Sequence, residues 1–68
     1  MTKQDLKRDI AQMTGSSMPS ISEIARYLGV GRDTARGLVD GLDYYSAGRA
    51  KKYFAGDVAE RILQQRGN

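Results

Sequence analysis

The apolar residues of this chain recur at helical spacing in four segments and follow a different pattern in one. The first segment, residues 2–14, has one apolar face among polar and charged positions, made by Leu6, Ile10 and Met13. Apolar residues at i, i+4 and i+7 predict an amphipathic helix. Thr2 with Asp5 predicts its N-terminal cap, and Gly15 predicts its end.

Two short helices are predicted within residues 20–40, with a three-residue corner between them. Ser20 and Glu23 form a capping-box pair that starts the first helix. Gly29 ends it, and the second helix covers 32–40. Apolar positions on both helices supply a shared core: Ile24, Leu28, Ala35 and Leu38. The corner has a small residue, a residue suited to positive φ and an apolar plug, in the order Ala25, Gly29 and Val30. This arrangement predicts a helix-turn-helix.

Residues 43–54 change to short runs that contain aromatic side chains. Two such runs flank the tetrapeptide AGRA, and this pattern predicts a β-hairpin in which Gly48 supplies a positive φ. A final helix is predicted over 57–65, beginning at Asp57 in the place of a capping serine. Residues 64–68 are expected to fray.

The aromatic and methionine side chains of so small a domain can either pack in its core or bind a partner. We expect the aromatic residues to lie mainly in the core, with their hydroxyls at the surface: Tyr27, Tyr44, Tyr45, Tyr53 and Phe54. Met13 and Met18 are expected to fill gaps in the core. The alternatives are that the hairpin aromatics stack on unpaired bases, or that the face of Leu6, Ile10 and Met13 binds a protein.

Composition narrows the function to binding. The 68 residues contain no Cys, His or Trp, which excludes disulfides, zinc sites and thiol or imidazole catalysis. We therefore expect no enzymatic activity, no cofactor and no metal, with Asp40 and Asp43 as solvated carboxylates. No segment has the pattern of a targeting signal or a membrane span, which predicts a cytoplasmic protein. The excess of 11 Lys+Arg over 8 Asp+Glu, a net charge of +3, favours nucleic acid or another anionic partner.

Positive charge is placed on the second helix of the predicted helix-turn-helix and on the hairpin. Arg32 and Arg36 stand one turn apart on that helix, and arginine binds both guanine edges and phosphate. Asp33 either accepts from a cytosine amino group or favours the helix N-terminus through the macrodipole. Residues 46–54 carry three cations and no acid: Arg49, Lys51 and Lys52. Such a loop follows a phosphate backbone or, taken alone, is a solvated turn.

The chain resembles the winged helix-turn-helix domains of the excisionase and MerR-like superfamily in four stretches: ISEIARYLGVGRDTAR at 21–36, SAGR at 46–49, KYF at 52–54 and the pair Asp57-Val58. This resemblance covers about residues 20–63 and implies a mainly α winged helix-turn-helix fold with a small β-hairpin wing. The length of the chain predicts a single domain over residues 1–68, to which the first helix adds outside the common motif. The resemblance implies DNA contacts by Arg32, Asp33, Thr34, Arg36, Arg49, Lys51 and Lys52. Two positions depart from the family pattern, because Gly31 replaces the usual capping serine and Gly37 offers no polar side chain.

Together these features predict a protein that binds double-stranded DNA in a sequence-specific way. It would act as an excisionase-like architectural factor in DNA recombination, or as a small transcriptional regulator of a mobile element or phage. One small module contacts few bases, so we expect a homodimer or a cooperative array on DNA, with an integrase or the transcription machinery as a further partner. The alternatives are a protein-interaction module and an RNA or single-strand binder.

Overall fold

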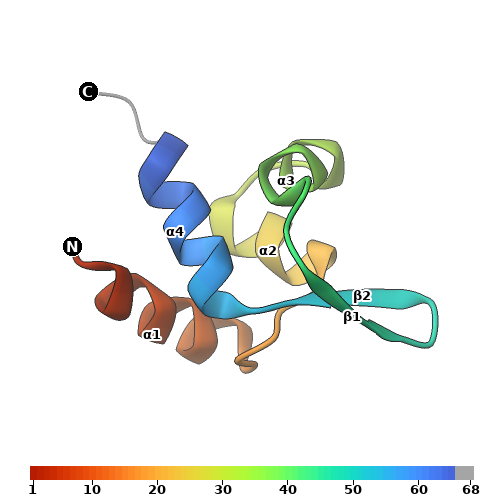
Figure 1. Cartoon of the computed structure of the whole chain (residues 1–68), viewed down its shortest axis with the longest axis horizontal. Helices are drawn as coiled ribbons and strands as arrows, with labels where there is room; N and C mark the ends of the chain where they lie inside the picture. The colour runs from red at the N-terminus through yellow and green to blue at the C-terminus, as the bar shows by residue number, and fades with distance from the viewer. Residues whose placement is uncertain (66–68) are drawn as a thin grey trace.

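Residues 1–65, which the structure describes, form four helices and one antiparallel hairpin (Figure 1). In this computed structural model the elements follow in the order α1 (Lys3–Thr14), α2 (Ile21–Leu28), α3 (Arg32–Val39), β1 (Tyr44–Ala47), β2 (Ala50–Tyr53) and α4 (Ala55–Gln65). The predicted mainly α chain with a small hairpin is confirmed. Helix α4 is continuous to Gln65, and the fraying predicted for residues 66–68 lies outside the described part of the chain.

The helix ends follow the capping residues of the sequence. The Thr2 and Ser20 hydroxyls each accept a hydrogen bond from the backbone N–H three residues later, and the acidic side chain at that position accepts from the cap N–H. Gly15 and Gly29 take left-handed conformations at φ values of 76° and 71°, which close α1 and α2. Gly31 begins α3 without a side-chain cap, as its lack of a side chain predicts.

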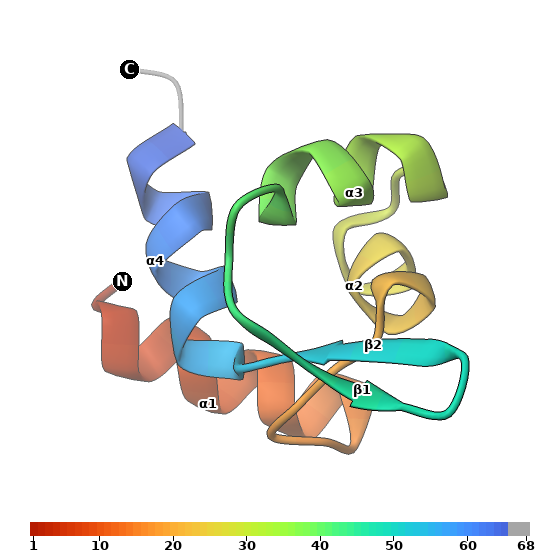
Figure 2. The same ribbon diagram turned by 45° about the vertical axis from the view of Figure 1, so that its right-hand side comes forward.

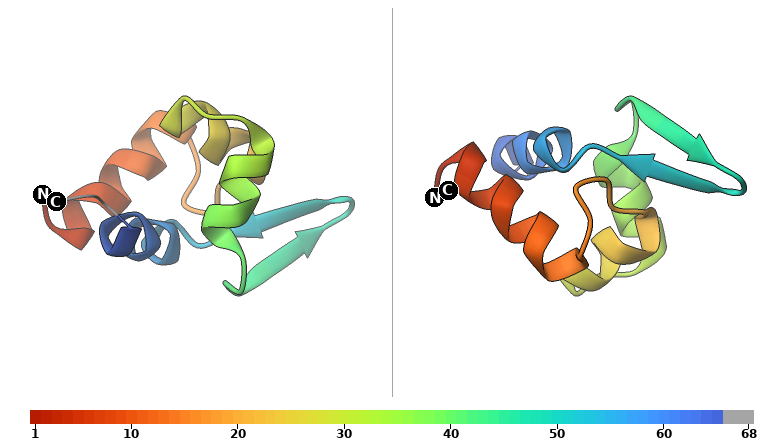
Figure 3. Two further views of the ribbon diagram at one scale, coloured as in Figure 1. Left: turned by 90° about the horizontal axis from the view of Figure 1, so that it is seen from above. Right: turned by 90° about the horizontal axis from the view of Figure 1, so that it is seen from below.

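Helix α1 packs along α4 and against α2 (Figure 3). The core draws on all four helices and β2: Leu6, Ile10, Ile24, Ala25, Ala35, Val39, Tyr53, Ala55, Val58 and Ala59. Met13 is 72% exposed, so the expectation that it fills the core is wrong. It lies in the last turn of α1, past the end of the core, beside an open groove that Tyr27 and Leu28 also line.

Backbone hydrogen bonds set the corner between α2 and α3. The Gly29 N–H donates to the carbonyls of Ala25 and Arg26, and the Val30 N–H donates to the Ala25 carbonyl at 3.0 Å. Ala25 is buried as predicted, but Val30 is exposed, and its predicted role as an apolar plug is wrong. The buried alanines at Ala25 and Ala35 let the two helices meet without it.

The hairpin is held on one of its edges by the segment that precedes α2. The Tyr53 N–H donates to the Pro19 carbonyl at 2.9 Å, and the Ala55 N–H donates to the Ser17 carbonyl at 3.0 Å. Ser20 also forms an isolated antiparallel bridge with Lys52. The connector thus pairs with β2 like a short third strand, which the sequence pattern does not predict.

A two-residue turn joins β1 to β2 and fixes their register. Tyr44 lies opposite Tyr53, and Tyr45 lies opposite Lys52. Gly48 is the first turn residue and has a φ of 64°, as predicted. A positive φ at that position is the pattern of a type II′ turn, whose twist suits the two strands.

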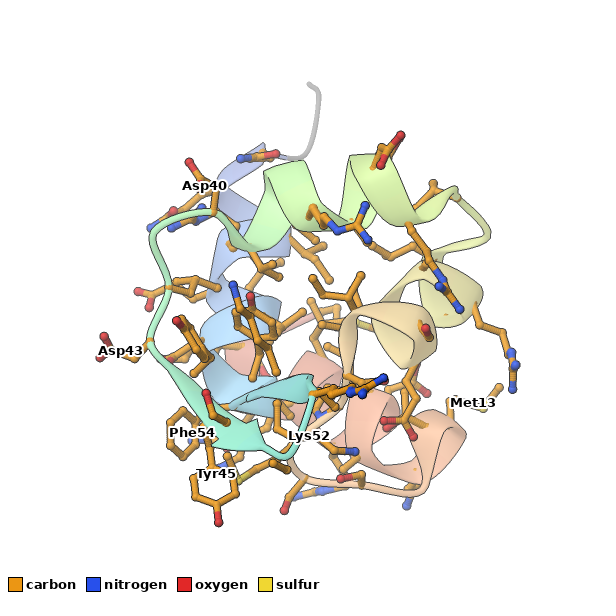
Figure 4. The ribbon with its side chains drawn as sticks, turned by 90° about the vertical axis from the view of Figure 1, so that its right-hand side faces the viewer. Met13, Asp40, Asp43, Tyr45, Lys52 and Phe54 are labelled. Atoms are coloured by element: carbon orange, nitrogen blue, oxygen red, sulfur yellow. The ribbon has the colours of Figure 1, made fainter. Side chains whose placement is uncertain are left out.

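The hairpin aromatics divide between its two faces, because successive side chains of a strand point to opposite sides. Tyr53 is buried, and its ring centroid lies 5.8 Å from that of the more exposed Tyr44. Tyr45 and Phe54 are 62% and 47% exposed and point away from the helices (Figure 4). The expectation that these aromatics lie mainly in the core is therefore wrong for three of the five: Tyr44, Tyr45 and Phe54 lie where the hairpin joins the rest of the chain, yet about half or more of each side chain stays exposed.

Helix α4 begins two residues earlier than the sequence pattern predicts. Its first residue is Ala55, and the Val58 N–H already donates to the Phe54 carbonyl at 3.0 Å. Asp57 is therefore a first-turn residue and not the N-cap. The early start follows from the pairing of Ala55 with Ser17, which brings the end of β2 directly onto the core.

Arg61 of α4 closes the C-terminal end of α3. Its Nη1 donates to the carbonyls of Leu38 and Asp40, both at 2.9 Å. Asp40 has a φ of −57°, so α3 does not end on a left-handed residue at that position. The guanidinium thus satisfies carbonyl groups at the end of α3. A cation is also favourable at this end because of the helix dipole.

Substitution Arg61→Ala tests this contact. We expect it to lower the free energy of unfolding by about 1 to 2 kcal/mol, because two carbonyls lose a charged donor. Urea denaturation followed by circular dichroism measures the change. Gln64→Ala, at an exposed position of the same helix, is the matched control. An equal effect of both substitutions would show that Arg61 contributes only helix propensity.

The Tyr27 hydroxyl donates to the Asp9 carboxylate and ties α2 to α1. Burial, and after it the hydrogen bond and charge of Asp9, raises the pKa of Tyr27 from its ordinary 10.0 to about 12. The folded state therefore favours the neutral phenol. This contribution to stability is complete below about pH 10 and is lost as the pH rises through 12.

We expect Tyr27→Phe to remove this pH dependence. The wild-type protein should lose more free energy of unfolding between pH 9 and pH 11.5 than the variant, measured by urea denaturation at each pH. Tyr45→Phe, which changes an exposed ring, should behave as the wild type does. The same alkaline loss in Tyr27→Phe and in the wild type would contradict the assignment.

Candidate nucleic-acid interface

Residues of α3 and the hairpin line a groove of about 470 Å³. Figure 2 shows that α3 and the hairpin lie on the side of the molecule away from α1 and α4. We call this groove the α3–hairpin groove. Its lining comes from the start of α2, the second half of α3, the following loop and the hairpin: Ser20, Ile21, Ser22, Arg36, Val39, Asp40, Gly41, Leu42, Tyr44, Arg49, Ala50, Lys51 and Tyr53. The pairing of β2 with the connector is what places the hairpin opposite α3.

Three of the seven predicted DNA-binding residues line this groove: Arg36, Arg49 and Lys51. They come from two elements that are not adjacent in sequence, and all three side chains are exposed. Asp40 is the acidic residue among the lining residues. The groove therefore has an excess of positive charge on walls that are otherwise apolar or carry hydroxyl groups.

Three further predicted residues lie outside the groove, at the start of α3: Arg32, Asp33 and Thr34. All are exposed. The helix that carries them is eight residues long, or about 12 Å at 1.5 Å per residue. Its first turn thus adds exposed polar side chains on the same helix whose second half lines the groove.

Asp33 and Arg36 form an ion pair across one turn of α3. The Arg36 Nη1 donates to the Asp33 Oδ1 at 2.8 Å. The Asp33 side chain is 99% exposed and that of Arg36 is 58% exposed. An exposed pair at this spacing contributes little to stability, so the pair chiefly orients the guanidinium.

Lys51 is oriented by an aromatic ring. Its Nζ lies 4.8 Å from the centroid of the Tyr44 ring, which in turn packs against Tyr53. Such a cation–π contact holds the ammonium over the ring without neutralising it. Lys51 thus remains available to an anion in the α3–hairpin groove.

Lys52, the seventh predicted residue, is paired within the protein. Its Nζ lies 3.5 Å from Glu23 Oε1, and the same oxygen accepts from the Ser20 N–H at 2.9 Å. The Ser20 hydrogen bond, and after it the charge of Lys52, lowers the pKa of the Glu23 carboxyl. Lys52 thus joins the hairpin to α2, and it lies outside the α3–hairpin groove.

The sequence does not indicate that two of the groove residues belong to a binding surface. Ser20 and Ser22 line the groove at the start of α2, yet the sequence marks Ser20 only as a cap. Their position depends on the backbone pairing of the connector with β2, which joins residues more than thirty positions apart. The ion pair of Lys52 with Glu23 is missed for the same reason.

Within residues 1–65, no three Asp or Glu side chains come together as a metal site would require. Asp40 and Asp43 are both exposed and stand apart at the edge of the molecule (Figure 4). None of the helices of this part of the chain has the length and apolar character needed to cross a membrane.

Comparison of the chain with models of protein families, with curated proteins and with solved structures finds no match.

We expect Lys52→Ala to raise the pKa of Glu23 without restoring its ordinary value of 4.5, because the Ser20 N–H still favours the carboxylate. Titration of the Glu23 carboxyl carbon by NMR measures this shift. Lys51→Ala, which removes a neighbouring cation that faces the groove, should leave the titration of Glu23 unchanged. A Glu23 pKa that does not respond to Lys52→Ala would contradict the ion pair.

Proposed function

We propose that this protein binds double-stranded DNA through α3 and the hairpin, in the manner of a winged helix-turn-helix. The observation that carries the proposal is the convergence of Arg36, Arg49 and Lys51 on one groove beside an exposed helix. A major groove about 12 Å wide accepts an α-helix, and cations on a flanking hairpin suit the phosphate backbone. Such a binding surface requires no catalytic group.

The two elements have different roles in this proposal. Arg32, Thr34 and Arg36 of α3 contact base edges and adjacent phosphates, since they point outward from a helix of suitable length. Arg49 and Lys51 contact phosphates and contribute affinity for any sequence. Lys52 supports the hairpin through Glu23 and contributes to the positive potential.

We further propose that the protein acts as a homodimer or a cooperative array, because a single module of this size buries little DNA surface. In that form it serves as an excisionase-like architectural factor or as a small transcriptional regulator of a mobile element or phage. An integrase or the transcription machinery is the further partner of such a role.

The structure argues against one alternative function, protein binding by α1, and offers an observation in favour of the other, single-strand binding. The apolar face of α1 is largely used by the core, since Leu6 and Ile10 are buried, and this argues against a docking face there. Single-strand binding has a specific observation in its favour, because Tyr45 and Phe54 are exposed aromatics on the hairpin. Exposed rings stack on unpaired bases.

The test is a salt-dependent titration of the full chain against duplex DNA, single-stranded DNA and RNA. We expect duplex affinity whose log–log salt slope is about −0.9 per phosphate contacted, with Arg49→Ala and Lys51→Ala each making the slope less steep by about one contact. Arg36→Ala should reduce both affinity and sequence preference. Arg8→Ala removes the same charge from an exposed position on α1, outside the groove, and should change the slope little.

Absence of duplex affinity at low salt would overturn the proposal. Preference for single strands, with a loss of affinity in Tyr45→Ala greater than that in Lys51→Ala, would establish the alternative function. Sedimentation with and without duplex tests the assembly, and a monomer bound tightly to one isolated site would contradict the array.

A further inference from the structure

Asp33 is an acidic residue on the helix proposed to bind DNA, in a first turn where the helix dipole favours a carboxylate. Its carboxylate is 99% exposed on the first turn of the helix that carries Arg32 and Arg36. A phosphate brought close to this surface is repelled by the carboxylate, so Asp33 opposes the affinity that the neighbouring arginines provide. The ion pair with Arg36 contributes little to the stability of the free protein, because water screens an exposed pair.

The free energy of the Asp33 carboxylate rises when a partner excludes water from α3, because the carboxylate loses its hydration. A carboxylate in such an interface requires a donor, and an unpaired one is costly. Two kinds of donor are within reach of a side chain on this turn: the Arg36 guanidinium, already at 2.8 Å, and an amino group on a base edge, such as cytosine N4. A phosphate oxygen offers neither charge complementarity nor a proton.

The same hydrogen bond constrains Arg36. A guanidinium has five N–H donors in a planar fork, and Asp33 holds one that belongs to Nη1. The remaining donors can still form the two parallel bonds that guanine O6 and N7 accept. A phosphate placed on Arg36 would approach the Asp33 carboxylate, so the pair favours a base edge over the backbone.

We propose that Asp33 is a specificity-determining residue, which acts by positioning Arg36 for base edges and by disfavouring a phosphate on Arg36. The inference rests on the proposed DNA binding, and it assigns to Asp33 discrimination between sequences in place of affinity.

Asp40 provides a matched control on the same surface. It is an exposed acidic residue at the other end of α3 and lines the α3–hairpin groove. Its side chain makes no ion pair with any residue of the described chain. Asp40→Asn therefore removes the same charge as Asp33→Asn without releasing Arg36.

The experiment uses the full chain and a duplex that the wild-type protein selects from a random-sequence pool. Affinities for this duplex and for a scrambled one are measured over a range of salt. We expect Asp33→Asn to reduce the ratio of the two affinities by about 5- to 150-fold, the discrimination of one good base contact. Binding to the scrambled duplex should tighten, with a salt slope steeper by about 0.9, as Arg36 turns to phosphate. Asp40→Asn should strengthen binding to both duplexes alike.

A background of Arg36→Ala tests positioning directly. If Asp33 acts through Arg36, most of the effect of Asp33→Asn on the ratio disappears in that background. An unchanged ratio in Asp33→Asn, or equal changes in Asp33→Asn and Asp40→Asn, would overturn the inference and leave DNA binding intact. A wild-type protein that binds duplexes without preferring any sequence would also overturn the inference and leave DNA binding intact. A wild-type protein without duplex affinity overturns the proposed function and this inference together.

Discussion

The backbone pairing of β2 with the connector is the constraint on which the rest of the structure depends. Tyr53 and Ala55 donate to carbonyls of the segment that leads into α2, so these two hydrogen bonds join the hairpin to the start of that helix. A two-stranded hairpin is marginal on its own in water. Here the connector supplies a third partner and the buried Tyr53 ring supplies an anchor, and the α3–hairpin groove exists because both are in place.

Local features of this fold were predictable from the sequence because they depend on a few adjacent residues. The capping boxes at Thr2 and Ser20 and the left-handed glycines at Gly15 and Gly29 are of this kind. Apart from the start of α4 at Ala55, the predictions that were wrong concern which side chains other elements cover. Met13, Val30 and Tyr45 are apolar or aromatic at positions where periodicity points inward, yet no neighbouring element reaches them.

Part of the candidate site was also predictable from the sequence, and part depends on contacts between distant residues. Clustering of cations on α3 and the hairpin is visible in the sequence, and the structure brings Arg36, Arg49 and Lys51 to one groove. Whether a given cation faces the groove or pairs within the protein depends on contacts between distant residues. Lys51 and Lys52 are neighbours in sequence, but alternation along β2 sends one to the groove and the other to Glu23.

The two ends of α3 are held very differently. At its C-terminal end Arg61 occupies the last carbonyls, whereas at its N-terminal end Gly31 offers no side-chain acceptor to the first amides. Gly37 further lowers the intrinsic helix propensity of this short element. The first turn of α3, which carries Arg32 and Asp33, therefore lacks the side-chain hydrogen bonds that Arg61 gives the last turn. In the proposed DNA binding, any ordering of this turn is part of the free energy of binding and lowers the affinity.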